Sequence, residues 1–187
     1  MNIPEVTNYG NGNAESFESY LSRWPKEYSN IPECLIKNWI HRHWADFKSK
    51  WITEGALTWK YELINFSNET LMDIGVPDNL RACIDHWGSE LFTKTQRRET
   101  WLAARMLECG TTPAPILVFR NKGRLPSLIK YAANGRSSAF FLIEGHLRTA
   151  YLWEMIRHQH EHLKDQHQVW VAEDDLSQPS DGARVAP

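Results

Sequence analysis

The sequence predicts an α/β (α+β) fold, in which a mainly helical region precedes a core with a small mixed sheet. In the first half, apolar side chains recur at three- and four-residue steps, as in amphipathic helices. In the second half, helix and strand patterns alternate three times. With 187 residues, of which 42% are hydrophobic, the chain is long enough for a hydrophobic core and too apolar for a disordered protein.

The longest helix of the first half is predicted to begin after Asn30 and Pro32, which are typical of a helix start. Its spacing places the apolar residues on one face, which we expect to be buried. The polar sequence His41-Arg42-His43 interrupts this face and is expected at a surface or an interface. The apolar residues of the face are Ile36, Ile40, Trp44, Phe47 and Trp51.

Shorter elements complete the first half. Residues 57–66 (LTWKYELINF) alternate well enough for a strand. Short helices are expected near 68–74 and 77–87, each closed by a glycine, Gly75 and Gly88.

In the second half, a helix capped by Thr93 or Thr95 is predicted to run to Cys109, with Gly110 as its stop. A short helix is expected over 126–135, and a longer one through about residue 163. The three predicted buried strands are 116–119 (ILVF), 139–143 (AFFLI) and 169–172 (VWVA). The expected organisation is a frayed N-terminus (1–13), a helical, Trp-rich region (14–92), an α/β core (93–173) and a disordered acidic tail (174–187).

The net charge of -2 conceals an uneven distribution. Residues 1–90 carry a net charge of -5 and residues 91–187 carry +3, while the window 94–136 alone carries +7. Such a basic stripe favours a nucleotide or a phosphate backbone as partner, although a charge run can also be only a solvated face. The residues predicted to follow a DNA backbone are Arg97, Arg98, Arg120, Lys122, Arg124, Lys130 and Arg136.

The segment FFLIEGHLRTAYL carries the most informative motif, because a buried strand ends, Gly145 makes the turn and a helix begins at once. Helix N-termini present unpaired N–H groups and a partial positive charge, so they bind phosphate. Arg148 is one turn further and is a candidate phosphate ligand. Glu144 is a candidate ligand for a divalent metal, and His146 a candidate general acid or base. The alternative is a structural turn, in which the arginine pairs with an acid.

The stretch from ETWLAARMLECG through PAPILVF to FFLIEGHLRTAYL resembles the core of the ParB/sulfiredoxin superfamily. The resemblance covers about residues 95–173 and places Gly145 and Arg148 at the family's Gly and Arg positions. It implies a nucleoside triphosphate at this turn, ATP or CTP, held by Gly145, His146 and Arg148. We expect ATP with Mg²⁺ as cofactors, Glu144 as the metal ligand, and Glu144, His146 and Arg148 as the catalytic residues.

Three differences from the family argue against two of its known functions in this chain. Sulfiredoxins have their catalytic cysteine directly after this glycine, where this chain has His146, so sulfinic acid reduction is not expected. ParB proteins have Glu-Arg-Arg there, whereas His-Leu-Arg leaves one arginine of the two. The chain has no room after the core for ParB's DNA-binding and dimerisation regions, so a centromere clamp is not expected either.

With its Trp-rich helical half, the whole chain is similar to the plasmid-encoded fertility inhibition proteins of the oncogenic suppression type. These are small factors associated with ATP hydrolysis and DNA cleavage that block DNA transfer by competing conjugation systems. The resemblance therefore implies an ATPase and DNase whose partners are the transferred or relaxosome DNA and components of type IV secretion or coupling machinery.

The alternative is a non-catalytic interaction protein that blocks a secretion or coupling component with its Trp-rich helical surface. Six of the nine tryptophans precede residue 90. We interpret most of them as core side chains, with Trp24 and Trp87 as candidates for contact with a partner.

Other patterns in the sequence point to no further chemistry. The histidines at 158, 160 and 162 fall near a polar helix end and are expected to be solvated rather than metal ligands. The three cysteines form no CxxC motif, and no Walker A sequence occurs. The sequence has no apolar run of eighteen residues and no signal peptide, so we expect no membrane span. The expected location is the cytoplasm, where the protein could also bind peripherally to the inner face of the membrane.

Overall fold

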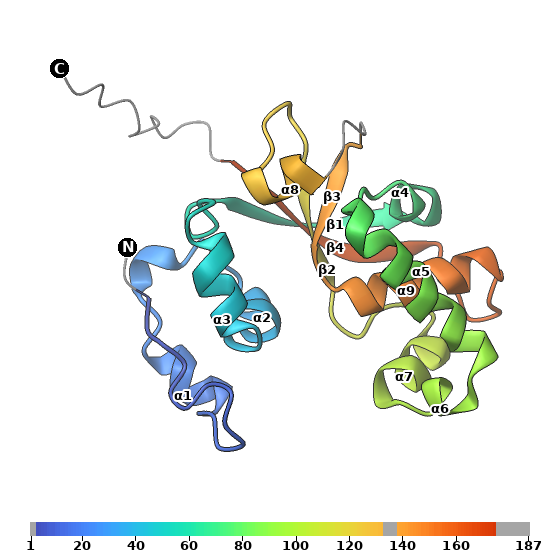
Figure 1. Ribbon diagram of the computed structural model, residues 1–187, viewed down its shortest axis with the longest axis horizontal. Helices are drawn as coiled ribbons and strands as arrows, with labels where there is room; N and C mark the ends of the chain where they lie inside the picture. Colours follow the sequence, from blue (N-terminus) through green and yellow to red (C-terminus); the bar gives the residue numbers. More distant parts are fainter. Residues whose placement is uncertain (1–2, 133–137, 175–187) are drawn as a thin grey trace.

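A four-stranded mixed sheet with the order β1-β4-β2-β3 lies at the centre of the fold (Figure 1). β4 pairs antiparallel with β1 and parallel with β2, and β2 pairs antiparallel with β3. This computed structural model describes residues 3–132 and 138–174. The mixed sheet and its helices confirm the predicted α/β (α+β) class. The strands are β1 (Lys60–Ser67), β2 (Ile116–Arg120), β3 (Phe140–Glu144) and β4 (Gln166–Glu173).

Helices cover both faces of this sheet (Figure 1). The first group precedes β1 and consists of α1 (Phe17–Ser22), η1 (Lys26–Tyr28), α2 (Glu33–Leu35), η2 (Ile36–His41), α3 (Trp44–Asp46) and η3 (Phe47–Trp51). The remaining helices are α4 (Asn68–Met72), α5 (Asp78–Thr93), α6 (Thr95–Arg98), α7 (Trp101–Cys109), α8 (Ser127–Ala132) and α9 (His146–Arg157).

The alternation of side chains along β2 explains why the sheet is covered on both faces. Leu117 and Phe119 pack into the aromatic cluster of the N-terminal helices. Ile116 and Val118 point to the opposite face, where they join a second cluster with α5, α7 and α9. Because successive strand residues face opposite sides, a strand that is buried throughout needs a hydrophobic layer on each side.

Tryptophans form the centre of the N-terminal layer. The ring of Trp39 lies 4.8 Å from that of Phe47, edge to face, and Trp59 lies 5.0 Å from Phe119 on β2. Trp39 and Trp59 are 2% and 1% exposed, and Trp44 and Trp51 are also buried. These four tryptophans join the helices to the sheet, as expected for core residues, and none of them is part of an exposed surface.

Four predicted helices differ in the structure. The helix predicted from Thr93 or Thr95 to Cys109 is divided into α6 and α7, because the backbone of Thr100 is extended and caps α7. The predicted stop at Gly88 is wrong, because α5 continues through it to Thr93. A Cβ atom at Gly88 would lie 2.8 Å from the carbonyl oxygen of Ala150, so the glycine allows α5 and α9 to pack closely. The predicted helix over 36–51 is interrupted at His43, whose backbone leaves the helical region before α3 begins. α9 ends at Arg157 rather than near residue 163, and Gln159 takes a positive φ soon after it.

The N-terminal segment lies against the helices instead of projecting freely. Ile3 and Val6 are buried in the aromatic cluster, and the backbone N–H of Thr7 donates to Glu15 at 2.7 Å. Asp174 of the expected tail is described and lies 3.7 Å from Arg124, while residues 175–187 lie outside the described residues. Among the helices described, none is both long and apolar enough to cross a membrane.

Candidate functional site at the start of α9

The turn between β3 and α9 requires a glycine for two reasons. Gly145 has φ of +98°, in the left-handed region that other residues adopt at a cost. A Cβ atom there would also lie 2.7 Å from Cγ2 of Ile116 on β2. The glycine thus allows α9 to begin directly against the central strand.

Arg148 fastens this turn to the loop before β2. Its Nη1 donates to the carbonyl oxygens of Ala114 and Pro115, at 2.8 and 3.0 Å. Its Nη2 donates to Oε2 of Glu144, and both side chains are less than a fifth exposed. Arg148 therefore pairs with a carboxylate and donates its hydrogen bonds to the protein itself. This is the alternative that the sequence left open, a structural turn in which the arginine pairs with an acid.

Glu144 lies between two cationic or potentially cationic groups. Arg148 contacts Oε2, and Nε2 of His43 lies 3.8 Å from Oε1. His43 comes from the turn before α3, more than a hundred residues away in the sequence. The carboxylate thus keeps one oxygen directed toward the N-terminal helices.

His146, the first residue of α9, is kept neutral near pH 7. Burial lowers its pKa below the usual value, and the nearby charges of Glu144, His43, Asp46 and Arg148 partly offset one another. A neutral imidazole can accept a proton, which is the property required of a general base.

These residues line a cleft of about 860 Å³ between the N-terminal helices and the β3–α9 turn. That volume falls within the range of pockets for small ligands, roughly 300–1,000 Å³. One wall is polar and consists of Lys37, Asn38, Arg42, His43, Asp46 and Lys50; we call it the helical wall. The second, the junction wall, runs from Glu144 to Arg148. The third, the apolar wall, includes Leu80, Trp87, Trp101, Leu102 and Leu128.

Arg42 is the least constrained cation of the cleft. Lys50 pairs with Asp46 at 2.5 Å, and Lys37 lies 5.3 Å from the ring of Phe17. Arg42 is exposed, and its guanidinium makes no ion pair within the described part of the chain. Its hydrogen bonds are made by the backbone, whose N–H donates to the carbonyl oxygen of Trp39 and whose oxygen accepts from the hydroxyl of Tyr9 at 3.3 Å. The sequence prediction missed this wall, although the polar break at His41-Arg42-His43 is a signal for it.

The predicted basic stripe is divided between two parts of the molecule. Arg97 and Arg98 lie on α6. The other described cations, Arg120, Lys122, Arg124 and Lys130, lie on β2, on α8 and between them, far from α6 (Figure 1). Lys130 is exposed on α8. Arg136 lies outside the described residues.

Acidic side chains already pair with most of these cations. Glu173 at the end of β4 lies 3.3 Å from Arg120 and 2.9 Å from Lys122. On the other side of the molecule, Glu90 accepts hydrogen bonds from Lys94 and Arg97. Lys94 and Arg97 hold the pKa of Glu90 at about 2. Glu90 and Glu173 thus each offset part of the positive charge of two cations, while Arg98 and Lys130 have no ion pair among the described residues.

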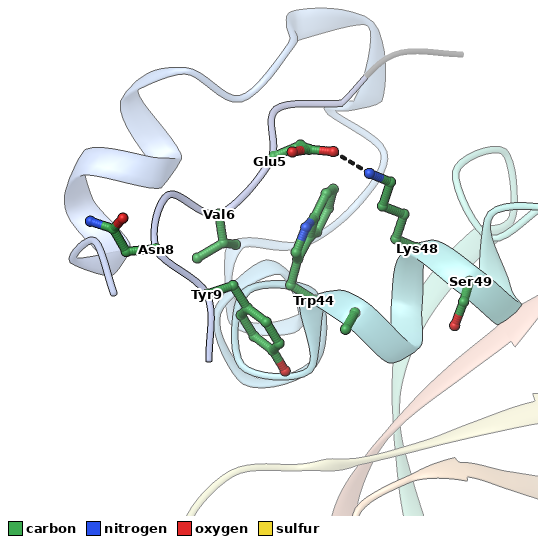
Figure 2. Close-up of a pocket in the computed structure, with 8 residues that line it drawn as sticks. Glu5, Val6, Asn8, Tyr9, Trp44, Lys48 and Ser49 are labelled. Atoms are coloured by element: carbon green, nitrogen blue, oxygen red, sulfur yellow. Dashed lines mark hydrogen bonds and ion pairs between the residues drawn. The ribbon is translucent and has the colours of Figure 1, made fainter. Parts of the chain in front are cut away.

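A second hollow, of about 670 Å³, lies between the N-terminal segment and α3. Figure 2 shows Glu5 and Lys48 paired above the ring of Trp44, with Tyr9 to the side. Its only two charged side chains are thus paired with each other, and it brings together no group of the β3–α9 turn.

The remaining histidines and the cysteines form no metal site. Within residues 3–132 and 138–174, no three His, Cys, Asp or Glu side chains are placed to hold a metal ion together. His158 pairs instead with Glu154 at 3.1 Å, and the three cysteines are free.

No protein-family model, curated protein or solved structure matches this chain. The functional conclusion therefore depends on the cleft and on the sequence resemblance.

Proposed function

We propose that this chain binds ATP with Mg²⁺ in the cleft and hydrolyses it, and that it also cleaves DNA and thereby inhibits conjugative, type IV secretion-dependent DNA transfer. The observation that supports this most is the combination in one cleft of a free guanidinium, Arg42, with a carboxylate and a neutral imidazole, Glu144 and His146. The DNA transfer role depends on the resemblance to fertility inhibition proteins alone.

The three walls suit the parts of a nucleotide. Arg42, with Lys37 and Lys50, offers positive charge to phosphates, and arginine can bind phosphate oxygens in pairs. The apolar wall offers Trp87 and Trp101 to a base, because aromatic rings stack on bases. Arg148 acts on the ligand indirectly in this proposal, by fixing Glu144 and the turn.

The donors also suit Mg²⁺, which takes one or two carboxylates and completes its shell with water and substrate phosphates. Glu144 would hold it through Oε1, since Arg148 engages Oε2. When bound, Mg²⁺ would neutralise charge on the phosphates.

For hydrolysis, the chain has to position a water and accept its proton. His146 is neutral and lines the cleft beside Glu144, so its ring can take the proton as the water oxygen bonds to phosphorus. His43, beside Oε1 of Glu144, is placed to donate to the phosphate oxygen that departs.

The direct test is phosphate release from Mg-ATP by the wild type, Glu144→Gln and His146→Gln. We expect each variant to lose at least tenfold in rate, because general acid–base groups contribute about 10²–10⁴-fold. Glu161→Gln is the matched control, because this carboxylate is 81% exposed and lies outside the cleft. Wild-type rates in both cleft variants would contradict the proposal.

The pH dependence of the rate gives a second test. Since the pKa of His146 is lowered, the ring remains unprotonated and able to act as a base through neutral pH. The rate should therefore fall only at a pH below 6.5, the usual pKa of a histidine. His146→Gln should remove this acid limb, and an unchanged profile in that variant would contradict the role of His146.

The non-catalytic alternative depended on an exposed tryptophan surface. Four tryptophans are buried in the N-terminal layer, while the two candidate contact residues, Trp24 and Trp87, are half-buried, so this alternative stays a prediction. Trp101 is exposed, but it lines the cleft.

A further inference from the structure

We infer that the DNA substrate is single-stranded and that an unpaired strand occupies the same cleft as the nucleotide, so that ATP and the strand exclude each other. This inference rests on the proposed function and names the form of DNA on which it acts.

Trp101 is the first observation. It is 73% exposed, more than any other large hydrophobic side chain described, and it lines the cleft at the beginning of α7. Leu128, 39% exposed, lines the same cleft from α8. An indole that is exposed to this extent lies at the rim and is accessible to a base of a ligand that extends out of the cleft.

Charge on the helical wall is the second observation. Arg42 has no ion pair within the described residues, whereas Arg97, Arg120 and Lys122 of the basic stripe are paired with Glu90 or Glu173. Arg98 and Lys130 of the stripe also have no ion pair among the described residues, but Arg42 is the unpaired arginine that lines the cleft together with the aromatic rim. Proteins that bind single strands without sequence preference use a groove in which cations contact the phosphate backbone and aromatic rings stack on the bases.

The size of the cleft favours an unpaired strand over a duplex. About 860 Å³ is the volume of a small-molecule pocket, and a duplex keeps its bases stacked between two backbones. Side chains inside such a cleft reach a nucleotide only when it is unpaired or extruded. Because Glu144 and His146 are in the cleft, the strand that they act on must be single.

The test uses a labelled oligodeoxynucleotide of about 12 nucleotides, within the usual site sizes. Its binding to the wild type is measured by fluorescence anisotropy in Mg²⁺, as a free strand and annealed to its complement, with phosphorothioate linkages that resist cleavage. We expect the free strand to bind tightly and the annealed duplex to bind weakly, and we expect Mg-ATP to displace the bound strand. The affinity should fall with salt as for two or three phosphates, with a log–log slope of about -2.

Variants at Trp101 separate stacking from general attraction. Trp101→Ala should weaken strand binding about tenfold, which corresponds to the loss of one stacked base, and Trp101→Phe should retain most of the affinity. Leu63→Ala is the control, because this side chain is 40% exposed on β1 and lies outside the cleft. Because Trp101 is exposed, these variants should fold normally.

The outcomes are distinct. Equal binding of duplex and strand, equal affinity in Trp101→Ala, tighter binding of RNA of the same sequence, or failure of Mg-ATP to displace a strand would each overturn the inference while ATP binding stands. If Mg-ATP does not bind the protein without DNA, the proposed function fails, and the shared cleft fails with it.

Discussion

The helical wall and the junction wall of the cleft use their charged groups differently. On the junction wall, Arg148 directs its donors at Glu144, Ala114 and Pro115. On the helical wall, Arg42 has no partner of opposite charge among the residues described. The strongest sequence motif thus contains an arginine that holds the structure together, and the cation available to a ligand comes from a segment without a motif. Substitutions of Gly145 and Arg148 in the junction wall should therefore act on stability, and substitution of Arg42 in the helical wall on binding.

Gly145→Ala should have the largest effect on stability. The left-handed backbone and the contact with Ile116 should together cost about 3 kcal/mol. Gly123→Ala is the matched control, because Gly123 has φ of +91° but no atom within 4 Å of a built Cβ, so it should lose only about 1 kcal/mol. Equilibrium unfolding in urea measures both. Equal losses would mean that the contact with Ile116 is unimportant.

Arg148→Ala should destabilise the protein by about 2–4 kcal/mol, because it leaves the Glu144 carboxylate and two carbonyl oxygens without donors. Arg157→Ala provides the comparison. Arg157 pairs with Glu154 and Asp85, at 2.9 and 3.1 Å, but is 35% exposed, so its loss should cost about 1 kcal/mol or less. If both variants lose the same amount, Arg148 is an ordinary surface ion pair and the distinction between the two walls fails.

Glu90 shows the same kind of pairing outside the cleft, and its effect depends on pH. Lys94 and Arg97 lower its pKa from 4.5 to about 2. The lowered pKa stabilises the fold fully above pH 4.5, and this contribution is lost as the pH falls toward 2. Glu90→Gln should therefore flatten the dependence of unfolding free energy on pH in this window. An unchanged slope in the variant would show that Glu90 is not ion-paired in solution.

Arg42→Ala should have the smallest effect on stability, within about 0.5 kcal/mol, since an exposed side chain without an ion pair is removed. Arg105→Ala, on the exposed face of α7, is the control for loss of an arginine. Thermal unfolding without ligand measures both. A loss near that of Arg148→Ala would mean that Arg42 has a structural partner and is not free for phosphate.

The sequence was sufficient for the fold class and for the β3–α9 turn, because both depend on local patterns. Phe140–Glu144 is buried and apolar, and Gly145 marks the reversal, so the strand–turn–helix order could be predicted. The role of Arg148 could not be chosen from the sequence, because its carbonyl partners lie more than thirty residues earlier.

The helical wall could not be predicted for the same physical reason. Arg42 and His43 reach the cleft only because Trp39 and Trp59 pack the N-terminal helices onto β2. That placement is a tertiary effect, and spacing along the chain does not encode it. The prediction at Gly88 was wrong for a similar reason, because a glycine is required there by the close approach of the α9 backbone, which the sequence around Gly88 does not show.

Isothermal titration of Mg-ATP into the wild type, Arg42→Ala and Arg105→Ala tests the central claim most directly. The account predicts binding to the wild type and to Arg105→Ala with equal affinity, and about tenfold weaker binding to Arg42→Ala, since a charge-assisted contact to phosphate contributes about 1.5–3 kcal/mol. Equal affinity of all three proteins, or no binding to the wild type, would contradict it.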